Sequence, residues 1–398
     1  MLLSPNIPKL LFILLLIWPA YLFAQPLTLN DALNAAIEKH RVANKLNLSQ
    51  TQIEQPVDSW LASPPSVSLL YLHNQQSVGA REAEISLNLA IKSNLQKEID
   101  QQLRSSTPLI QRHVLKQQAL FLSGLIRSIV WEYKQQYVLI KQAEQKLTIL
   151  TSLLDHYKLF SKAGNSPQYL TLLVKQETIQ SRLALLEHQN KAQALLSEYY
   201  ALTGIVDLPA NTNETAEYDS LVNINQHPDI QALDAYWQLY QAQSKESSHQ
   251  SRPWNVSVNA KQIETAGTKE NQIGLGVEVP LSFGSSNTQS QYSAYTAAQS
   301  QYYLERDKLV QQIQQSINSA KAQLELSNER QSLLDDALTI TLQLQPTLDS
   351  LLASNITDQE WLLRRTLEIV DIQAQFATNQ INLHKNLATL NQAAGISL

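Results

Sequence analysis

The 398-residue chain contains no cysteine, which excludes a disulfide framework, a thiol nucleophile, a thiolate metal site and a lipid-bearing cysteine. Charged residues make up only 16% of the sequence, well below the usual quarter or so. The net charge is -5, so nothing in the composition attracts nucleic acid. Gln, Asn and Ser fill the vacant polar positions, which is typical of a solvated surface rather than an enzyme core.

Long hydrophobic runs are also lacking, except at the amino terminus. There Lys9 precedes an apolar run from Leu10 to Phe23 that ends in Ala24-Gln25. The run is shorter than the roughly 20 residues that a spanning helix needs, and it suits a signal peptide over residues 1–24, cleaved near Ala24/Gln25. A retained membrane anchor is the alternative. Since no other apolar helix is long enough to span, any membrane insertion must use strands.

Four short segments alternate apolar and polar residues. They form two pairs at matching points of two similar halves, and they run from Ser66 to Leu72, Glu84 to Ile91, Trp254 to Ile263 and Gln272 to Phe283. The last has a candidate lipid-facing side made of Ile273, Leu275, Val277, Val279, Leu281 and Phe283. Alternation of this kind predicts a strand with one apolar and one wet face. Four strands are too few for a membrane barrel, which needs about eight or more, so several chains must build one.

Aromatic residues lie near the ends of these strands. Trp254, Tyr71 and Phe283 either anchor the chain at a lipid interface or are simply good strand formers.

The chain is a tandem duplication. His40 and His227, Asn165 and Asn355, and Gly204 and Gly395 recur in similar context at an offset of about 190 residues. The predicted units are a first structural repeat over residues 25–204, a linker over 205–222 and a second repeat over 223–398. Each repeat is read as helix, strand, strand, long helix, tight turn and helix.

Helix signals are strong in both repeats. Thr28 and Asp31 form a capping box for a helix from Leu29 to about Gln55. A helix from Lys92 to Phe160 would be about 100 Å long, and Pro108 should interrupt or kink it.

The second repeat has a long helix from about Asn287 to Ala353, bent at Pro346, and a returning helix that extends to Ala394. The returning helix has one heptad series of Leu362, Ile369, Phe376, Leu383 and Leu390. A second series, about 100° round the cylinder, contains Leu363, Leu367, Val370, Ala374, Ala377, Ile381 and Ala388. Two adjacent seams suit a helix wedged between two neighbours, as in the wall of a helical tube. An ordinary bundle helix with a wide apolar face is the alternative.

Several motifs together resemble the TolC family of outer-membrane efflux channels. They are Leu27-Thr28-Leu29-Asn30-Asp31-Ala32-Leu33, the His227-Pro228-Asp229-Ile230-Gln231-Ala232 start of the second half, two helical turns and a closing Ala-Gly-Ile. The resemblance covers essentially all of the mature chain. It implies a mostly α fold with a small β part, in which a coiled-coil-like helical barrel continues into four transmembrane strands per chain. Three chains would close these strands as a trimeric 12-stranded β-barrel in the outer membrane, with the helical tunnel in the periplasm.

The resemblance also implies partners and a function. The channel would be the exit duct of a tripartite efflux system, and a periplasmic adaptor would join it to an inner-membrane pump. An RND-type pump is favoured, and an ABC-type pump is the alternative. It would pass small solutes, drugs or metal ions, without a cofactor or an enzyme activity. Its compact size resembles the CzcC-like subgroup of heavy-metal efflux channels. The alternatives are the outer-membrane channel of a type I protein secretion system and a periplasmic coiled-coil scaffold or adaptor.

The same resemblance places candidate sites at the two helical turns. Candidate adaptor contacts are Gly164, Asn165, Ser166 and Pro167 in the first turn, and Ser354, Asn355, Ile356 and Thr357 in the second. Asp358 and Glu360 follow the second turn, where family members narrow the tunnel, and Arg364 and Arg365 come within a turn. These four residues form a candidate periplasmic gate. Alternatively, Asp358 only complements the helix amino terminus and Glu360 only pairs with Arg364.

Overall fold

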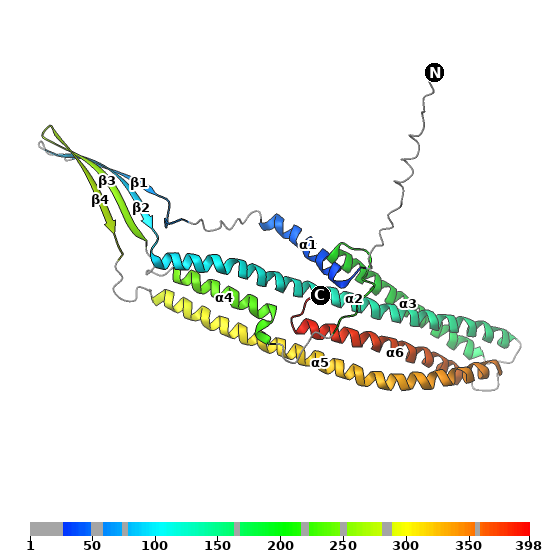
Figure 1. The fold of residues 1–398 in the computed structure, drawn as a ribbon. Coiled ribbons are helices and arrows are strands. Elements are labelled where there is room, and N and C mark those ends of the chain that lie inside the picture. Colours follow the sequence, from blue (N-terminus) through cyan, green and yellow to red (C-terminus); the bar gives the residue numbers. More distant parts are fainter. Residues whose placement is uncertain are drawn as a thin grey trace, which may run out of the picture.

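The fold is described from a computed structural model over residues 27–48, 59–73, 79–162, 168–215, 223–246, 253–280, 289–354 and 359–398. Residues 1–26, which include the predicted signal peptide, lie outside this part. The body is formed by four helices, α2 (Asn94–Lys162), α3 (Gln168–Thr203), α5 (Gln289–Ser354) and α6 (Gln359–Ala393). Figure 1 shows an elongated molecule with these helices side by side and the strands at one end.

The order of the long helices follows from their contacts. Helix α2 packs along α3, α5 packs along α6, and α6 also contacts α2 (Figure 1). Helix α6 is therefore wedged between two neighbours, as its two heptad seams predicted. The first seam buries Leu362, Ile369 and Leu390, and the second buries Leu363 and Val370.

Two shorter helices pack against the long ones. Helix α1 (Leu29–Leu48) packs on α2 and α3, and α4 (Pro228–Glu246), preceded by the 3-10 turn η1 (Ile224–Gln226), packs mainly on α2. Helix α4 lies in the half of the body nearer the strands (Figure 1). The predicted extension of the first helix to Gln55 falls partly on residues 49–58, outside the described part. Leu33 of α1, Ile126 of α2 and Tyr199 of α3 share one buried core.

Side-chain caps begin two of the helices. The capping box before α1 is confirmed, because the Thr28 amide donates to Asp31 Oδ2 at 2.9 Å and the Asp31 amide donates to Thr28 Oγ1 at 3.2 Å. The Thr28 hydroxyl also donates to Asp31 Oδ2 at 2.7 Å, and this bond, together with that from the Thr28 amide, holds the pKa of the Asp31 carboxyl below its usual value. A second box, which the sequence analysis missed, starts α2: the Ser93 amide donates to Gln96 Oε1 at 3.0 Å, and the Gln96 amide to Ser93 Oγ at 3.3 Å.

Neither proline ends its helix. Helix α2 continues through Pro108 to Lys162, and α5 continues through Pro346 to Ser354. The prediction that Pro108 interrupts the helix is therefore wrong on that point. A proline removes only one backbone amide donor from the many hydrogen bonds of a long helix. Packing against the neighbouring long helices holds the remaining turns in place.

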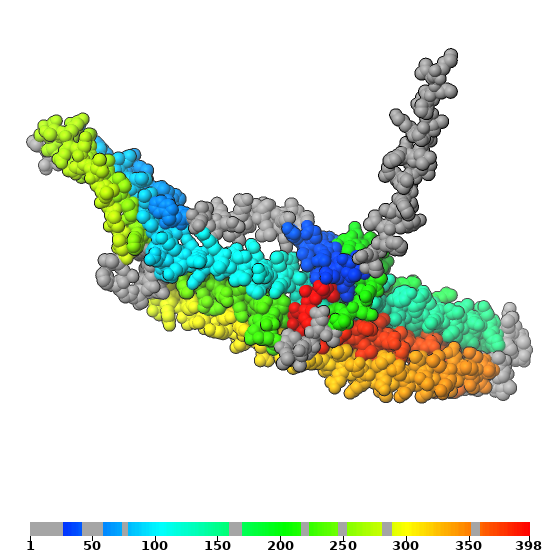
Figure 2. Space-filling view, in the orientation of Figure 1, coloured from blue at the N-terminus to red at the C-terminus, as the bar shows by residue number. Residues whose placement is uncertain are grey.

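Strands β1 (Ser66–His73), β2 (Arg81–Ile91), β3 (Trp254–Thr265) and β4 (Thr268–Glu278) form one antiparallel sheet in the order β1-β2-β3-β4. All four predicted strands are present, and the pairing of β2 with β3 joins the two predicted repeats. Ala266 and Gly267 make a tight turn between β3 and β4 with positive φ angles of 51° and 85°. Figure 2 shows that the sheet projects beyond the helical body.

A buried arginine fastens Glu214, which lies in the predicted linker, to the body. Arg127 of α2, which is 4% exposed, donates from Nε to Glu214 Oε1 at 2.9 Å. Its Nη1 donates to Gln392 Oε1 at 2.6 Å and to the Ile396 carbonyl at 2.9 Å. A paired and fully hydrogen-bonded charge tolerates burial, whereas loss of one partner costs about 3–5 kcal/mol. This cluster ties α2, the linker and the end of α6 together.

Candidate functional site

The apolar face of the sheet extends over all four strands. Residues directly opposite each other in an antiparallel pair point to the same side, so the register assigns the faces. One cross-strand row on this side consists of Leu69, Ile85, Ala260 and Ile273. The next row consists of Val67, Leu87, Val258 and Leu275. Ile273 is 84% exposed and Leu275 is 81% exposed. An apolar surface of this breadth, open to water in the single chain, requires a lipid or protein partner.

The predicted lipid-facing strand agrees with this register over its described part. Val277 is paired with Val256 on the same side, and Val279, just beyond the strand, is exposed. Leu281 and Phe283, the last two residues of that prediction, lie outside the described residues.

The opposite face of the sheet is mostly polar. Lys261 Nζ lies 2.7 Å from Glu82 Oε2, and Asn259 Nδ2 donates to Glu84 Oε1 at 3.2 Å. Gly274 and Gly276 on β4 leave room for Asn259 and Ser257, since a Cβ at either glycine would lie within 2.5 Å of the opposite side-chain oxygen. Leu70, Leu72 and Ile263 are apolar exceptions on this face. The sheet thus has one face suited to hydrocarbon and one suited to water.

The far end of the body, here called the tip, consists of the described ends of α2, α3, α5 and α6 (Figure 1). Tyr157 of α2, Leu170 of α3 and Leu363 of α6 share a buried core there. The Tyr157 hydroxyl donates to Gln359 Oε1 at 3.1 Å, and burial raises the pKa of Tyr157. The start of α6 is therefore held against α2 within one chain.

Three of the candidate gate residues lie at the start of α6. Arg364 Nη2 is 2.7 Å from Glu360 Oε1, which confirms the i,i+4 pair expected from the sequence. The Arg364 side chain is 76% exposed and that of Glu360 is 33% exposed. Arg365 pairs instead with Glu368 and lies over the ring of Trp361. In a single chain, such an exposed pair contributes about 0.3–0.5 kcal/mol.

Most of the predicted turn residues fall outside the described ranges. Asp358, residues 164–167 and residues 355–357 lie outside the described residues. Ser354 is the last residue of α5. Their predicted roles in the gate and in adaptor contact stay predictions.

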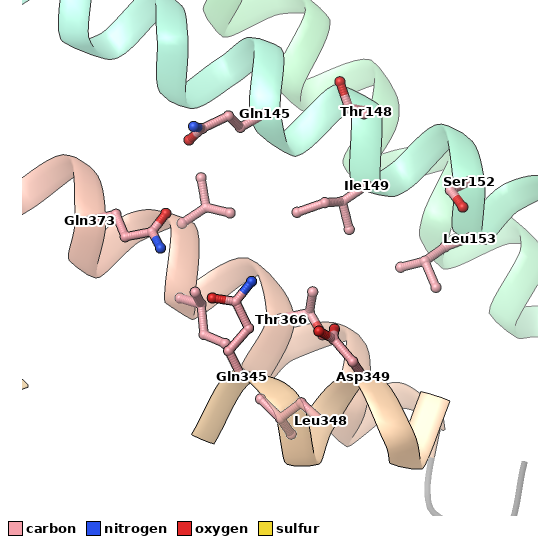
Figure 3. A pocket seen from close by; sticks show the side chains of 12 residues that line it. Gln145, Thr148, Ile149, Ser152, Leu153, Gln345, Leu348, Asp349, Thr366 and Gln373 are labelled. Atoms are coloured by element: carbon pink, nitrogen blue, oxygen red, sulfur yellow. The ribbon is translucent and has the colours of Figure 1, made fainter. Parts of the chain in front are cut away.

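A groove of about 520 Å³ runs beside α6 near the tip. Figure 3 shows side chains of α2, α5 and α6 converging on it. Apolar residues line part of it, namely Ile149, Leu153, Leu348, Ile369 and Val370. Gln145, Gln345, Asp349 and Gln373 are among its polar lining residues. This volume falls in the range of ligand-sized pockets. The carboxylate of Asp349 adds a negative charge to the lining.

Two outer helices each present an unpartnered apolar seam. On α3, Leu172, Ile179, Leu183 and Leu186 are exposed by about 60% each. On α5, Leu326, Leu333 and Ile340 repeat every seven residues and are similarly exposed. A second α5 series, Ala320, Ser327, Leu334, Thr341 and Leu348, is buried inside the chain. Both exposed seams have the spacing of coiled-coil interfaces, so each lacks one partner helix.

None of the helices within the described ranges combines the length and apolar character needed to cross a membrane.

Comparisons of sequence find no relative: no family model matches the chain, and no curated protein matches it. Comparisons of structure find several. The outer membrane protein VceC from Vibrio cholerae is similar with a TM-score of 0.71 at 14% identity, over 93% of this chain and 96% of that one. The protein has the fold of an outer-membrane channel.

Two further channels support the same fold. The CmeC outer membrane channel of Campylobacter jejuni has a TM-score of 0.67 at 11% identity, covering 92% of this chain and 85% of that one. The open state of the Neisseria gonorrhoeae MtrE outer membrane channel has a TM-score of 0.65 at 12% identity, covering 92% and 88%. At these identities the likeness establishes the fold, a long helical body with a small antiparallel sheet.

Sequence reasoning missed two features of the site. The seams on α3 and α5 have a local signal, because Leu172, Ile179 and Leu186 and, further on, Leu326, Leu333 and Ile340 recur every seven residues. The Arg127–Glu214 pair joins residues far apart in sequence. Its only local signal is an arginine within the apolar run of Ile126, Ile129 and Val130.

Proposed function

We propose that the protein is an outer-membrane channel of the TolC family, three copies of which form the exit duct of a tripartite efflux system. The sheet would lie in the outer membrane and the helices would form a tunnel through the periplasm, after removal of a signal peptide near Ala24/Gln25. A periplasmic adaptor would connect the duct to an inner-membrane pump of the RND type. The cargo would be small solutes, drugs or metal ions, and the CzcC-like subgroup stays a prediction.

The observation that carries this proposal is the two-faced sheet at the end of a long helical body. Its apolar side is exposed on all four strands, while the charges of Glu82, Glu84 and Lys261 gather on the other side. Backbone groups at the free edges of β1 and β4 need partners in lipid, and only neighbouring chains can supply them. Three sheets joined edge to edge would enclose the polar faces as a water-filled pore.

The exposed seams support the same assembly in the periplasm. Helix α3 lies at one flank of the chain and α5 at the other, because α2 and α6 lie between them (Figure 1). A seam on each flank allows α3 of one chain to pack on α5 of the next. Contacts between unlike surfaces of identical chains close into a ring when the rotation permits it.

The tip would meet the adaptor. The predicted adaptor contacts are residues 164–167, between α2 and α3, and residues 354–357, which start at the last residue of α5 and precede α6. Crosslinkers placed at Asn165 or Asn355 should capture the adaptor, whereas one placed at Thr265, at the far end of the sheet, should not.

The lipid face is tested by adjacent substitutions on β4. Ile273→Arg should impair insertion, because a charge facing hydrocarbon costs about 2–4 kcal/mol near the middle of the membrane. Gln272→Arg is the matched control, since it adds the same side chain one residue away on the polar face. Heat-modifiable trimers in outer-membrane fractions give the readout, and Leu275→Arg and Val277→Arg should behave like Ile273→Arg.

Equal assembly of the Ile273 and Gln272 variants would show that the face assignment is wrong. A stable, water-soluble monomer of the unmodified protein would favour the periplasmic scaffold instead.

A further inference from the structure

The apolar face of the sheet is bounded at its outer end by a row of charged and polar residues. His73 is paired with Arg81, Arg81 with Glu264, and Glu264 with Lys269, so the four residues form one line across the four strands. Along every strand, the residue in this row is separated from those in the apolar rows by an even number of positions. These side chains therefore project from the same side as Ile85 and Ile273, not from the polar face.

Between this row and the helical body the face becomes progressively apolar. The next row is mixed, with Tyr71, Ala83, Gln262 and Asn271. Three apolar rows follow, centred on Leu87 and Val258. The last row pairs Ile91 with Trp254. Polar residues on this face are thus confined to the end that lies farthest from the helices.

A tryptophan marks the inner end of the same face. Trp254, which is paired with Ile91 in the last row, is 46% exposed. Indole rings concentrate where lipid headgroups meet the hydrocarbon. Trp254 is also one of the aromatic residues predicted from the sequence to anchor the chain at a lipid interface.

The spacing of the two boundaries fits a bilayer. Strand β2 spans Arg81–Ile91, a rise of about 33 Å at 3.3 Å per residue. A tilt of about 40° reduces this to about 25 Å along the membrane normal, the height of the apolar band on outer-membrane barrels. The helices leave the sheet beyond Ile91, so the inner boundary faces the periplasm and the charged row faces the exterior.

We propose that these boundaries fix the depth of the protein in the bilayer, and that Arg81 and Lys269 bind phosphate groups of lipids in the outer leaflet. This inference rests on the proposed function and adds the identity of the lipid contact. A guanidinium and an ammonium group are strong donors to phosphate oxygens. Glu264 lies between them in the row, and its single negative charge does not match their combined positive charge.

Depth is measured with single cysteines, which the chain permits because it has none of its own. Spin labels at Arg81, Leu87 and Ile91 of the purified full-length protein in phosphatidylglycerol vesicles are compared for collision with oxygen and with a water-soluble nickel complex. The label at Leu87 should be deepest, and those at Arg81 and Ile91 shallow. Ser86, one residue from Leu87 on the polar face, is the control and should be open to the nickel complex.

The outcomes separate the two proposals. A deepest label at Arg81 or Ile91, with Ser86 still in water, would overturn the assigned depth but leave the channel intact. A Leu87 label as open to the nickel complex as that at Ser86 would overturn both proposals, because the sheet would not be in lipid.

The phosphate contact is tested by thermal unfolding in neutral detergent. Phosphatidylglycerol should raise the melting temperature of the unmodified protein, and inorganic phosphate at the same concentration should not. Arg81→Gln/Lys269→Gln should lose at least half of the shift. The control variant Lys175→Gln/Lys308→Gln removes the same charge from exposed helical positions. It should keep the full shift in melting temperature. An equal shift with inorganic phosphate, or a full shift in the Arg81/Lys269 variant, would overturn the lipid contact.

Discussion

At the scale of single residues, the start of α6 offers a sharp test of gating. Three copies of Glu360 would meet near the axis of a trimer, where Arg364 neutralises each carboxylate. Arg364→Ala should therefore loosen the resting gate, and Glu360→Gln should change cation preference or block while trimers still form. Single-channel recordings in planar bilayers measure opening frequency, conductance and selectivity.

A matched control lies on α3. Lys191→Ala breaks an exposed i,i+4 pair with Glu187 of similar geometry, at 2.6 Å, away from the start of α6. It should leave the recordings unchanged. If the Glu360 and Arg364 variants also match the unmodified protein, these residues have no part in the gate.

His227 should make stability depend on pH. Burial lowers its pKa below the ordinary value of about 6.5, and Asp229 opposes this shift incompletely. The unfolded chain therefore takes up a proton at a higher pH than the folded chain. The contribution of neutral His227 to folding stability should be fully present above about pH 6.5, and it should decline as the pH falls toward the lowered pKa of His227.

The measurement is the melting temperature in detergent between pH 7.5 and 5.5. In the protein the Asp229 amide donates a hydrogen bond to His227 Nδ1 at 3.2 Å, and the side-chain oxygen in the variant His227→Asn can still accept it. This variant should flatten the pH profile, because it removes the titrating imidazole. His40→Asn, the corresponding histidine of the first repeat, is the control. Parallel profiles for the unmodified protein and His227→Asn would refute the assignment.

At the scale of elements, two glycines end equivalent helices in different surroundings. Gly204 has a φ of 79° with nothing within 4 Å of an added Cβ, whereas Gly395 has a φ of 84° and an added Cβ would lie 2.7 Å from His227 Cδ2. Gly204→Ala should cost about 1–2 kcal/mol through its backbone conformation alone. Gly395→Ala should cost more, because the contact adds to the same strain.

Denaturant or thermal unfolding of the two variants, compared with the unmodified protein, gives the difference. Equal destabilisation would mean that the chain around His227 relaxes freely, and that the packing of this helix end contributes nothing.

Most elements could be predicted from the sequence, because their signals are local. The strands were recognised by alternation, but β2 was expected to begin at Glu84 and β4 at Gln272, whereas they begin at Arg81 and Thr268. Charged residues at the outer end of the sheet break the apolar alternation, although the backbone pairing continues through them. The Glu360–Arg364 pair was predictable because its partners lie one helical turn apart.

Long-range contacts were not predictable in the same way. Arg127 and Glu214 come from a helix and a linker, and no period connects them. The cross-strand rows needed the register between β2 and β3, which are far apart in the sequence. The charged row on the apolar face is visible only after that register is known, since its four residues are adjacent in space but not in sequence.

At the scale of the whole molecule, the seams predict a specific crosslink. Helix α3 runs away from the tip and α5 runs toward it, so Leu183 and Ile340 are each about 15 residues, or about 22 Å, from the tip. Leu183→Cys/Ile340→Cys should oxidise to covalent dimers and trimers, because α3 of one chain would face α5 of the next. Non-reducing electrophoresis after mild oxidation measures this.

Leu183→Cys/Leu304→Cys is the control. Leu304 is also exposed on α5 but lies about 50 residues from the tip, so no disulfide can reach it. Trimers that form without the Leu183–Ile340 crosslink would show that other helices meet at the interface.

The unlike seams on α3 and α5 also have a genetic consequence. Every chain in a ring would use both flanks, so a chain with a damaged sheet but intact seams would still be recruited into rings with normal chains. If equal amounts of the two chains mix at random, only about one ring in eight contains three normal copies. An allele such as Ile273→Arg should therefore act dominantly over the unmodified gene, and a second mutation that destroys either seam should make it recessive.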